Sequence, residues 1–272
     1  MRIAIPPADP ALSLDGRMLL AIDVGNTDIK LGVFDGDQLV AAWRWATDHV
    51  RMADEYAAQL AWLLHHHDLS FHSIDRTVLS SVVPSLTVTF LQLTMRYIGH
   101  EPLVVSSDLR GNIPLMVDNP REVGGDRIAN AVGARLLYGT PAIVVDFGTA
   151  TNFDVVSGDG AFLGGSFAPG IQSALDGLLS RAARLQRFDL AAPPKVIGTN
   201  TTMCLQSGTI FGYVALVEGL VARIKDELAS DAIVIGTGGL VDLIAGHTRS
   251  IGTVDRHLTL KGLRLLAAMN AP

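Results

Sequence analysis

The sequence carries one short pattern twice, and this repeat limits the chain to a small set of folds. An apolar run at residues 19–22 leads into Asp-Val-Gly-Asn-Thr at 23–27, and a second run at 142–145 leads into Asp-Phe-Gly-Thr-Ala-Thr at 146–151. In both places a strand-like stretch follows, then a turn containing Gly and Asp, then another strand-like stretch. Because the Asp, the Gly and the flanking pattern recur together, we predict a duplicated supersecondary unit rather than two unrelated hairpins.

Helical patterns lie between and after these strands. Apolar residues recur at helical spacing from residue 54 on, and further helices are expected at 86–98, 171–185, 208–228 and 258–269, with a short one ending at Ala245. Buried strands are expected at 77–83, 102–105 and 233–235. Strands that alternate with helices predict an α/β fold.

The length of 272 residues fits two domains or one large α/β domain. We expect an N-terminal lobe at residues 18–125 and a C-terminal lobe at 126–272, closely packed because no low-complexity linker separates them. Residues 1–17 contain prolines where a signal peptide has its apolar core, so we expect a disordered extension there.

Composition and charge exclude several classes of protein. Hydrophobic residues make up 49% of the chain, which excludes a disordered protein, and the single Cys excludes a disulfide-built module. The net charge of −6, without a dense Lys/Arg run, argues against a nucleic-acid partner. No stretch approaches the roughly 20 apolar residues that a membrane span needs. We therefore expect a soluble, cytoplasmic protein with no membrane partner.

The repeated turn offers groups that bind phosphate. Backbone N–H groups, with the side chains of Asn26 and Thr27, can donate to phosphate oxygens while Asp23 holds a hydrated Mg²⁺. Alone, the pattern is better explained by a plain hairpin turn. Its recurrence at Asp146 favours a phosphate clamp, and Gly-Thr-Gly-Gly at 236–239 is a third place where backbone can approach a ligand. The chain has neither the Walker nor the Rossmann phosphate-binding motif.

A second candidate segment begins with two glycines and continues into an apolar helix. Asp126 and Arg127 follow Gly124 and Gly125 directly. A carboxylate here can accept a proton from an attacking hydroxyl, and a guanidinium can stabilise anionic oxygens. A favourable interaction of the Asp with the helix dipole explains the pattern as well. The triplet His65-His66-His67 is interpreted as a solvated helix end and Cys204 as a packed thiol.

Together these residues resemble the type III pantothenate kinases, a family of the sugar kinase, Hsp70 and actin superfamily. The resemblance runs in order from about Met18 to the last helix, and it includes Ser-Val-Val-Pro at 81–84, Asp-Asn-Pro at 118–120 and Gln-Ser-Gly at 206–208. It implies an actin-like ATPase fold of two duplicated ribonuclease-H-like lobes. It also implies ATP-dependent phosphorylation of pantothenate, the first step toward coenzyme A, by a homodimer with the substrate site at the subunit interface.

The resemblance also implies roles for single residues. The ATP site would comprise Asp23, Val24, Gly25, Asn26, Thr27, Asp28, Ile29, Lys30 and Thr149, with Asp23 holding Mg²⁺ through water. Asp126 would be the catalytic base, and Gly124, Gly125, Asp126, Arg127 and Thr201 would bind pantothenate. Asp146 would hold a monovalent cation, K⁺ or ammonium.

Four positions depart from the usual family pattern. Gly125 replaces Ala, Thr199 replaces a basic residue, and Asp28 and Lys30 replace the commonest Asn and Val. The alternatives are a sugar kinase or phosphatase of the same superfamily, and a regulatory paralogue that has lost the transfer reaction.

Overall fold

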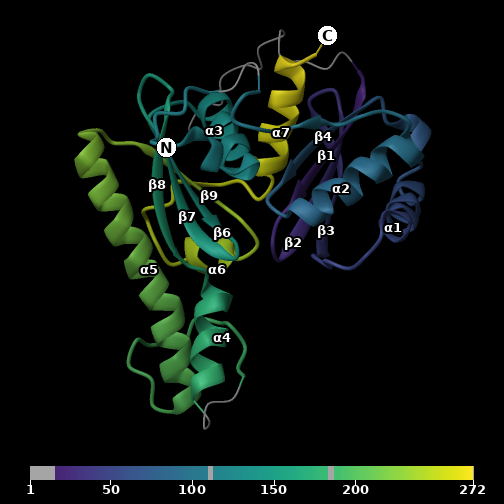
Figure 1. The fold of residues 1–272 in the computed structure, drawn as a ribbon. Helices are drawn as coiled ribbons and strands as arrows, with labels where there is room; N and C mark the ends of the chain where they lie inside the picture. Colours follow the sequence, from purple (N-terminus) through teal and green to yellow (C-terminus); the bar gives the residue numbers. More distant parts are fainter. Residues whose placement is uncertain (1–15, 110–112, 183–186, 272) are drawn as a thin grey trace. The chain divides into compact units, whose positions relative to one another are not determined.

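The computed structural model of the chain describes residues 16–109, 113–182 and 187–271 (Figure 1). The chain forms two compact units. Unit 1 combines the residues up to Leu137 with those from Leu258 on, and unit 2 comprises Tyr138–His257. Each unit is built on one five-stranded sheet.

Unit 1 contains the sheet β3-β2-β1-β4-β5. Its strands are β1 (Met18–Val24), β2 (Asp28–Asp35), β3 (Gln38–Ala46), β4 (Arg76–Ser81) and β5 (Leu103–Val104). Its α-helices are α1 (Ala53–His65), α2 (Pro84–Leu93), α3 (Gly125–Leu137) and α7 (Leu258–Met269). It also has the short 3-10 helices η2 (Phe71–Ser73) and η4 (Pro120–Glu122) and the π-helix η3 (Thr94–Ile98). The first three strands are antiparallel, whereas β4 runs parallel to β1.

The two faces of this sheet are covered by different helices. Leu20, Ile22 and Val24 of β1 belong to the apolar cluster that includes α1 and α2. Gly32 of β2 faces the other way, because a Cβ there would lie 3.0 Å from Leu260 of α7. Asp23 alternates with Ile22 and Val24 along β1, so its side chain shares the α7 face.

Unit 2 repeats the arrangement in the sheet β10-β9-β6-β7-β8. Its elements are β6 (Ala142–Phe147), β7 (Ala150–Val156), β8 (Phe162–Pro169), β9 (Ile233–Thr237), β10 (Thr253–Val254), α4 (Ile171–Arg181), α5 (Thr201–Leu228) and α6 (Val241–Ala245). β6, β7 and β8 are antiparallel, and β9 runs parallel to β6, as β4 does to β1. The ends of unit 2 are joined by a 2.7 Å hydrogen bond from the Tyr138 hydroxyl to Asp255 Oδ2. Burial, together with this bond, raises the pKa of Tyr138, so the phenol stays a donor.

The predicted duplication and the α/β class are confirmed, because both sheets share one strand order. Several boundaries differ. The compact units divide after Leu137, not before Asp126, because α3 packs on α7 within unit 1. β8 runs on to Pro169 and α5 begins at Thr201, seven residues before the expected start. The expectations for residues 1–15 and for a helix reaching 183–185 lie outside the described residues.

Candidate active site

Asp23 lies near the end of β1 and is held by two neighbours. Its carboxylate is buried, with 4% of the residue exposed. Oδ1 accepts a 3.0 Å hydrogen bond from Ser80 Oγ, and Oδ2 lies 3.5 Å from Lys30 Nζ. Both contacts follow from strand pairing, since β4 places Ser80 and β2 places Lys30 beside Asp23. The orientation of the carboxylate is therefore fixed before any ligand binds.

The turn after β1 presents exposed polar groups on a closed backbone. Gly25 N–H donates to the Asp28 carbonyl at 2.9 Å, and the side chains of Asn26 and Thr27 are exposed. Thr47 supports the turn from β3's end, with Oγ1 donating to the Gly25 carbonyl at 2.7 Å and its N–H donating to the Thr27 carbonyl at 3.0 Å. This geometry leaves the tip of the turn available to an anion.

Three of the predicted ATP-site side chains point elsewhere. Val24 and Ile29 are fully buried in the apolar core, so only their backbone can reach a ligand. Asp28 forms an ion pair with Arg44 on the neighbouring strand.

The start of α3 lies against the same face of the sheet as Asp23. A Cβ on Gly125 would be 3.0 Å from Ser80 Oγ, and one on Gly124 would be 3.2 Å from Val82. Asp126 follows in the first turn of α3, with its Oδ1 buried and 2.4 Å from where a Gly124 Cβ would stand. Ser80 thus lies between the Asp23 carboxylate and the helix that begins with Asp126.

Unit 2 has an equivalent arrangement around Asp146. Asp146 lies near the end of β6, is 7% exposed and is paired with Thr237 on the parallel strand β9. Gly238 follows with φ +94°, and a Cβ there would lie 2.4 Å from Asp146 Oδ1. Only glycine suits a residue with both constraints. The exposed Thr149 is in the turn after β6, and its carbonyl accepts from Ser173 Oγ at 2.8 Å.

Comparison with known proteins identifies the family. The sequence model described as type III pantothenate kinase matches residues 19–223, which is well over half of the chain. The chain belongs to the type III pantothenate kinase family. A curated member from Moorella thermoacetica is 48% identical over 253 residues, covering 93% of this chain and 100% of the relative. One from Thermomicrobium roseum is 49% identical, covering 91% of this chain and 95% of the relative.

Solved structures support the fold. A structure described as a Baf family transcriptional activator from Campylobacter jejuni aligns with a TM-score of 0.57 at 18% identity, covering 91% of this chain and 96% of that one. At this identity the match concerns the fold and not the activity. Together with the repeated five-stranded sheet, it agrees with the actin-like ATPase fold expected of a type III pantothenate kinase.

The predicted substrate residues of this type III pantothenate kinase family member fall in both units. Gly124 to Arg127 belong to unit 1, whereas Thr201 is the first residue of α5 in unit 2. Asn200 caps that helix, since its side chain accepts from Met203 N–H at 2.9 Å. Thr199 and Thr201 are both exposed.

Ser80 and Thr47 were not predicted as site residues. The contact between Ser80 and Asp23 joins residues 57 positions apart, and no local sequence pattern signals it. The support that Thr47 gives to the turn depends on the pairing of β2 with β3, so no local sequence pattern signals it either.

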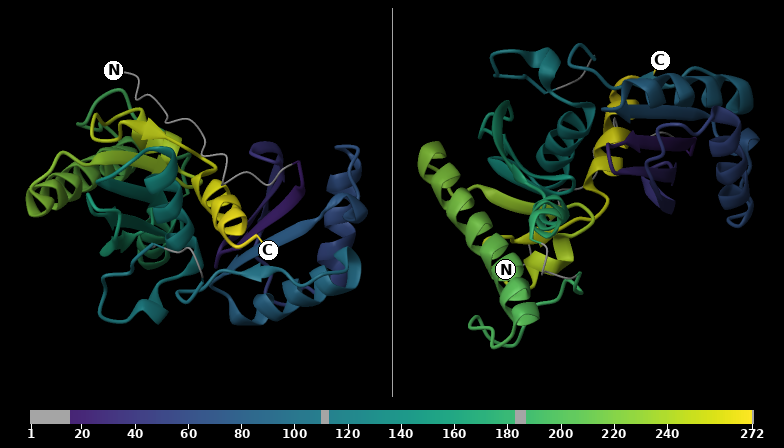
Figure 2. Two further views of the ribbon diagram at one scale, coloured as in Figure 1. Left: turned by 90° about the horizontal axis from the view of Figure 1, so that it is seen from above. Right: turned by 60° about the horizontal axis from the view of Figure 1, so that its bottom comes forward.

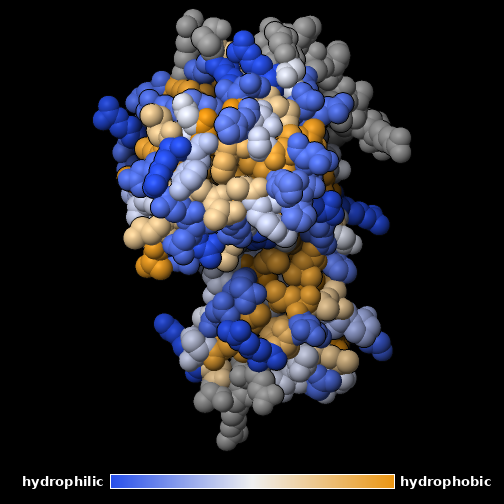
Figure 3. Space-filling model, turned by 90° about the vertical axis from the view of Figure 1, so that its right-hand side faces the viewer, coloured by the Kyte–Doolittle hydropathy of each residue, from blue (hydrophilic) through white to orange (hydrophobic). Residues whose placement is uncertain are grey.

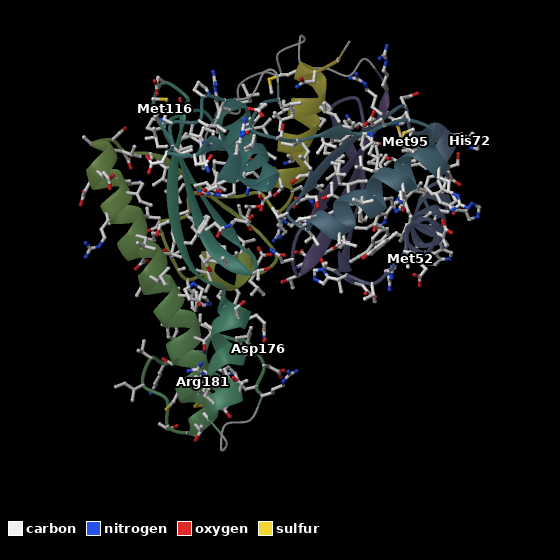
Figure 4. The ribbon with its side chains drawn as sticks, viewed as in Figure 1. Met52, His72, Met95, Met116, Asp176 and Arg181 are labelled. Carbon is white, nitrogen blue, oxygen red and sulfur yellow. The ribbon has the colours of Figure 1, made fainter. Side chains whose placement is uncertain are left out.

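Other candidate sites receive little support. His65, His66 and His67 are exposed at the end of α1, as expected, and the described ranges contain no group of three or more His, Cys, Asp or Glu that can hold a metal. Cys204 is exposed and not packed, because its helix turns that side to the surface, so that expectation was wrong. A 620 Å³ groove near the exposed Met52 and Met95 opens on the surface of unit 1 (Figure 4).

Helix α5 is long and apolar enough to cross a membrane by length and composition alone, and 28% of its most apolar 18-residue window is buried in the described structure. A core helix of a soluble protein passes the same test, so this is weak evidence for a membrane.

Proposed function

We propose that this chain transfers the terminal phosphoryl group of ATP to the primary hydroxyl of pantothenate, the first step of coenzyme A synthesis, with Asp126 as the general base. The observation that carries this proposal is the position of Ser80. It contacts the Asp23 carboxylate directly and lies against the first residue of α3. A phosphate-binding turn and a carboxylate at a helix start therefore share one face of the unit 1 sheet.

Each group has a defined task in this reaction. Asp126 accepts the proton of the attacking hydroxyl, and Arg127 stabilises the anionic phosphoryl oxygens. The turn at residues 25–27 positions the phosphates through N–H groups and the Asn26 and Thr27 side chains. Positioning and charge neutralisation supply most of the rate in phosphoryl transfer.

The donor atoms at Asp23 fit Mg²⁺. Mg²⁺ is held in kinases by one or two carboxylates, substrate phosphates and water, and Asp23 offers a fixed carboxylate beside an exposed turn. Bound there, the ion would neutralise phosphate charge. Lys30 lies close enough to add a second positive charge on the same side.

In unit 2, we infer that Asp146 holds a monovalent cation and that Thr149 contacts ATP. The buried Asp146 Oδ1 faces Gly238 at the end of β6, so a hard carboxylate oxygen is held at this position. K⁺ and ammonium suit an oxygen ligand of this kind.

We further infer a homodimer built on α5, with Thr201 contributing to the substrate site at its interface. Thr201, Gly208, Ala215 and Ala222 recur every seven residues on the exposed side of α5, with Gly212 and Gly219 between them. A Cβ at any of these three glycines would meet nothing within 4 Å. Each costs about 1 kcal/mol of helix stability relative to Ala, which the close approach of a second helix would offset.

Hydrophobic side chains also gather near this helix. Leu178 of α4, and Val196 and Ile197 shortly before α5, are exposed in unit 2. Figure 3 shows hydrophobic residues on the lower part of the molecule, on the side where α4 lies. A patch of this kind is typical of a protein interface. A soluble dimer, located in the cytoplasm, explains the apolar α5 without a membrane.

Release of ADP with pantothenate as acceptor tests the function. Asp126→Asn should lower kcat by about 10²–10⁴-fold, because Asn cannot take a proton, while the unfolding temperature stays unchanged. Glu122→Gln, on the exposed turn just before α3, is the matched control and should keep wild-type turnover. A folded Asp126→Asn protein with near wild-type turnover would remove Asp126 from its role.

The same assay also tests the monovalent cation site and the identity of the acceptor. Replacing K⁺ with Na⁺ should reduce the rate, and equal rates would contradict a selective cation site at Asp146. A panel of hydroxyl acceptors separates the alternatives. Transfer to a hexose and not to pantothenate would support a sugar kinase, and no transfer to any acceptor would support a regulatory paralogue.

A further inference from the structure

Helices α3 and α7 of unit 1 pack at unusually short range. They lie side by side in every view (Figures 1 and 2), and small residues make the contact possible. A Cβ on Gly262 of α7 would lie 1.9 Å from the Ala129 carbonyl oxygen, and one on Gly133 of α3 would lie 2.9 Å from Leu258. The two helix backbones therefore touch directly.

A buried polar pair lies within this contact. Thr259 Oγ1 donates a 2.8 Å hydrogen bond to Asn130 Oδ1, and the residues are 2% and 1% exposed. The contact is specific, because a buried hydroxyl or amide that loses its partner costs about 1–3 kcal/mol. A bond of this kind selects one rotation and one axial position of α3 against α7, whereas apolar contacts alone tolerate small slides.

Because Asn130 lies on α3, its hydrogen bond also fixes the position of the start of this helix. It follows Asp126 by four residues, so the two side chains stand on the same side of the helix, one turn apart. A slide by one residue would move Asp126 by about 1.5 Å. Displacements of about 1 Å are enough to lower a rate 10²-fold.

We propose that Thr259 and Asn130 are positioning residues, which hold the Asp126 carboxylate in its working place by fixing α3 against α7. This inference rests on the proposed role of Asp126. Neither residue touches the substrate, and both act through the helix.

The test compares Thr259→Val, which removes the hydroxyl at nearly constant volume, with Thr259→Ser, which keeps it. Thr259→Val should lower kcat about ten-fold with the KM for ATP unchanged, because the ATP-binding turn is on other elements. Thr259→Ser should restore kcat. Leu263→Val, one turn further along α7, is the control for lost packing, and it should lower the unfolding temperature without lowering kcat.

A double-mutant cycle decides between positioning and a merely structural role. In the Asp126→Asn background, Thr259→Val should cause no further loss, because the group that it positions is already inactive. Multiplying effects would overturn the proposal, as would a folded Thr259→Val protein with wild-type kcat. If Thr259→Val does not fold, Asn130→Ala takes its place in the cycle with the same expectations.

The same experiment separates the two hypotheses. Wild-type turnover in Asp126→Asn alone would refute the proposed base, whatever Thr259→Val does. A large loss in Asp126→Asn together with wild-type kcat in Thr259→Val would keep the base and refute only the positioning role.

Discussion

The Asp126 carboxylate occupies its place because Gly124 has no Cβ atom. Gly124 matters because a Cβ there would stand 2.4 Å from Asp126 Oδ1. Gly124→Ala should therefore push the carboxylate aside and lower kcat by about ten-fold or more, with little change in stability because a side-chain end can move.

Turnover and thermal unfolding, measured together, check this prediction. Gly158→Ala is the control, since a Cβ at that turn position meets nothing within 4 Å. It should change neither quantity. A Gly124→Ala protein that loses stability and activity in parallel would point to a damaged fold rather than to a displaced carboxylate.

Among single residues, the sequence predicts the site carboxylates that stand in a local pattern. Asp23 and Asp146 follow apolar runs directly, and Asp126 follows a glycine pair, so each can be selected from its neighbours in the chain. Ser80 carries no such signal, because it becomes relevant only when β4 pairs with β1. The individual roles of these residues stay predictions until they are measured.

At the scale of elements, the contact of α3 with α7 reverses an ordinary helix preference. Replacing a glycine inside a helix with Ala normally stabilises it by about 0.5–1 kcal/mol. Gly262→Ala should instead destabilise the protein by about 1–3 kcal/mol or more, because the new methyl group would meet the Ala129 backbone.

Denaturant unfolding of two variants measures this reversal. Gly177→Ala in α4 is the matched control, since nothing lies within 4 Å of its Cβ position. Because Ala is favoured over Gly inside a helix, this substitution should stabilise the protein. Equal gains from both substitutions would show that α3 and α7 are not in such close contact.

Element boundaries were harder to predict than element types. The Gly164-Gly165 pair weakens the strand pattern of β8, yet β7 requires a glycine there, because a Cβ on Gly165 would lie 1.7 Å from the Phe153 carbonyl oxygen. The expected helix at 208–228 already included Gly208 and Gly212, and the seven residues that it lacked begin at the start capped by Asn200. In β8, tertiary packing outweighs local propensity.

At the scale of the whole molecule, the row of small residues on α5 predicts assembly. Gly212→Leu should turn a dimer into a monomer by blocking close approach of a second helix, while favouring the helix itself. Light scattering after size exclusion would report half the wild-type mass.

A second leucine on the same helix controls for added hydrophobicity. Glu227→Leu lies outside the row, at the charged end of α5, and should leave the dimer intact. Pantothenate turnover should fall with dissociation if Thr201 acts at the interface. A wild-type protein that is monomeric at assay concentration would contradict the dimer directly.

The sequence predicts two lobes, but it does not predict which segments of the chain form each lobe. The repeated turn identifies two units, but no local signal shows that the last helix returns to the first unit. That assignment depends on Leu260 packing against Gly32, a contact between the two ends of the chain.

This return has a consequence for synthesis on the ribosome. The nascent chain completes all five strands of the first sheet before residue 105, but the helix that covers one of its faces comes only after residue 257. Ten of the twelve residues of α7 are buried, so the part of this face that α7 covers stays exposed while about 150 further residues, α3 among them, are translated. The second lobe can close as soon as its own last strand emerges. In this protein the segment made first is therefore the one that finishes folding last.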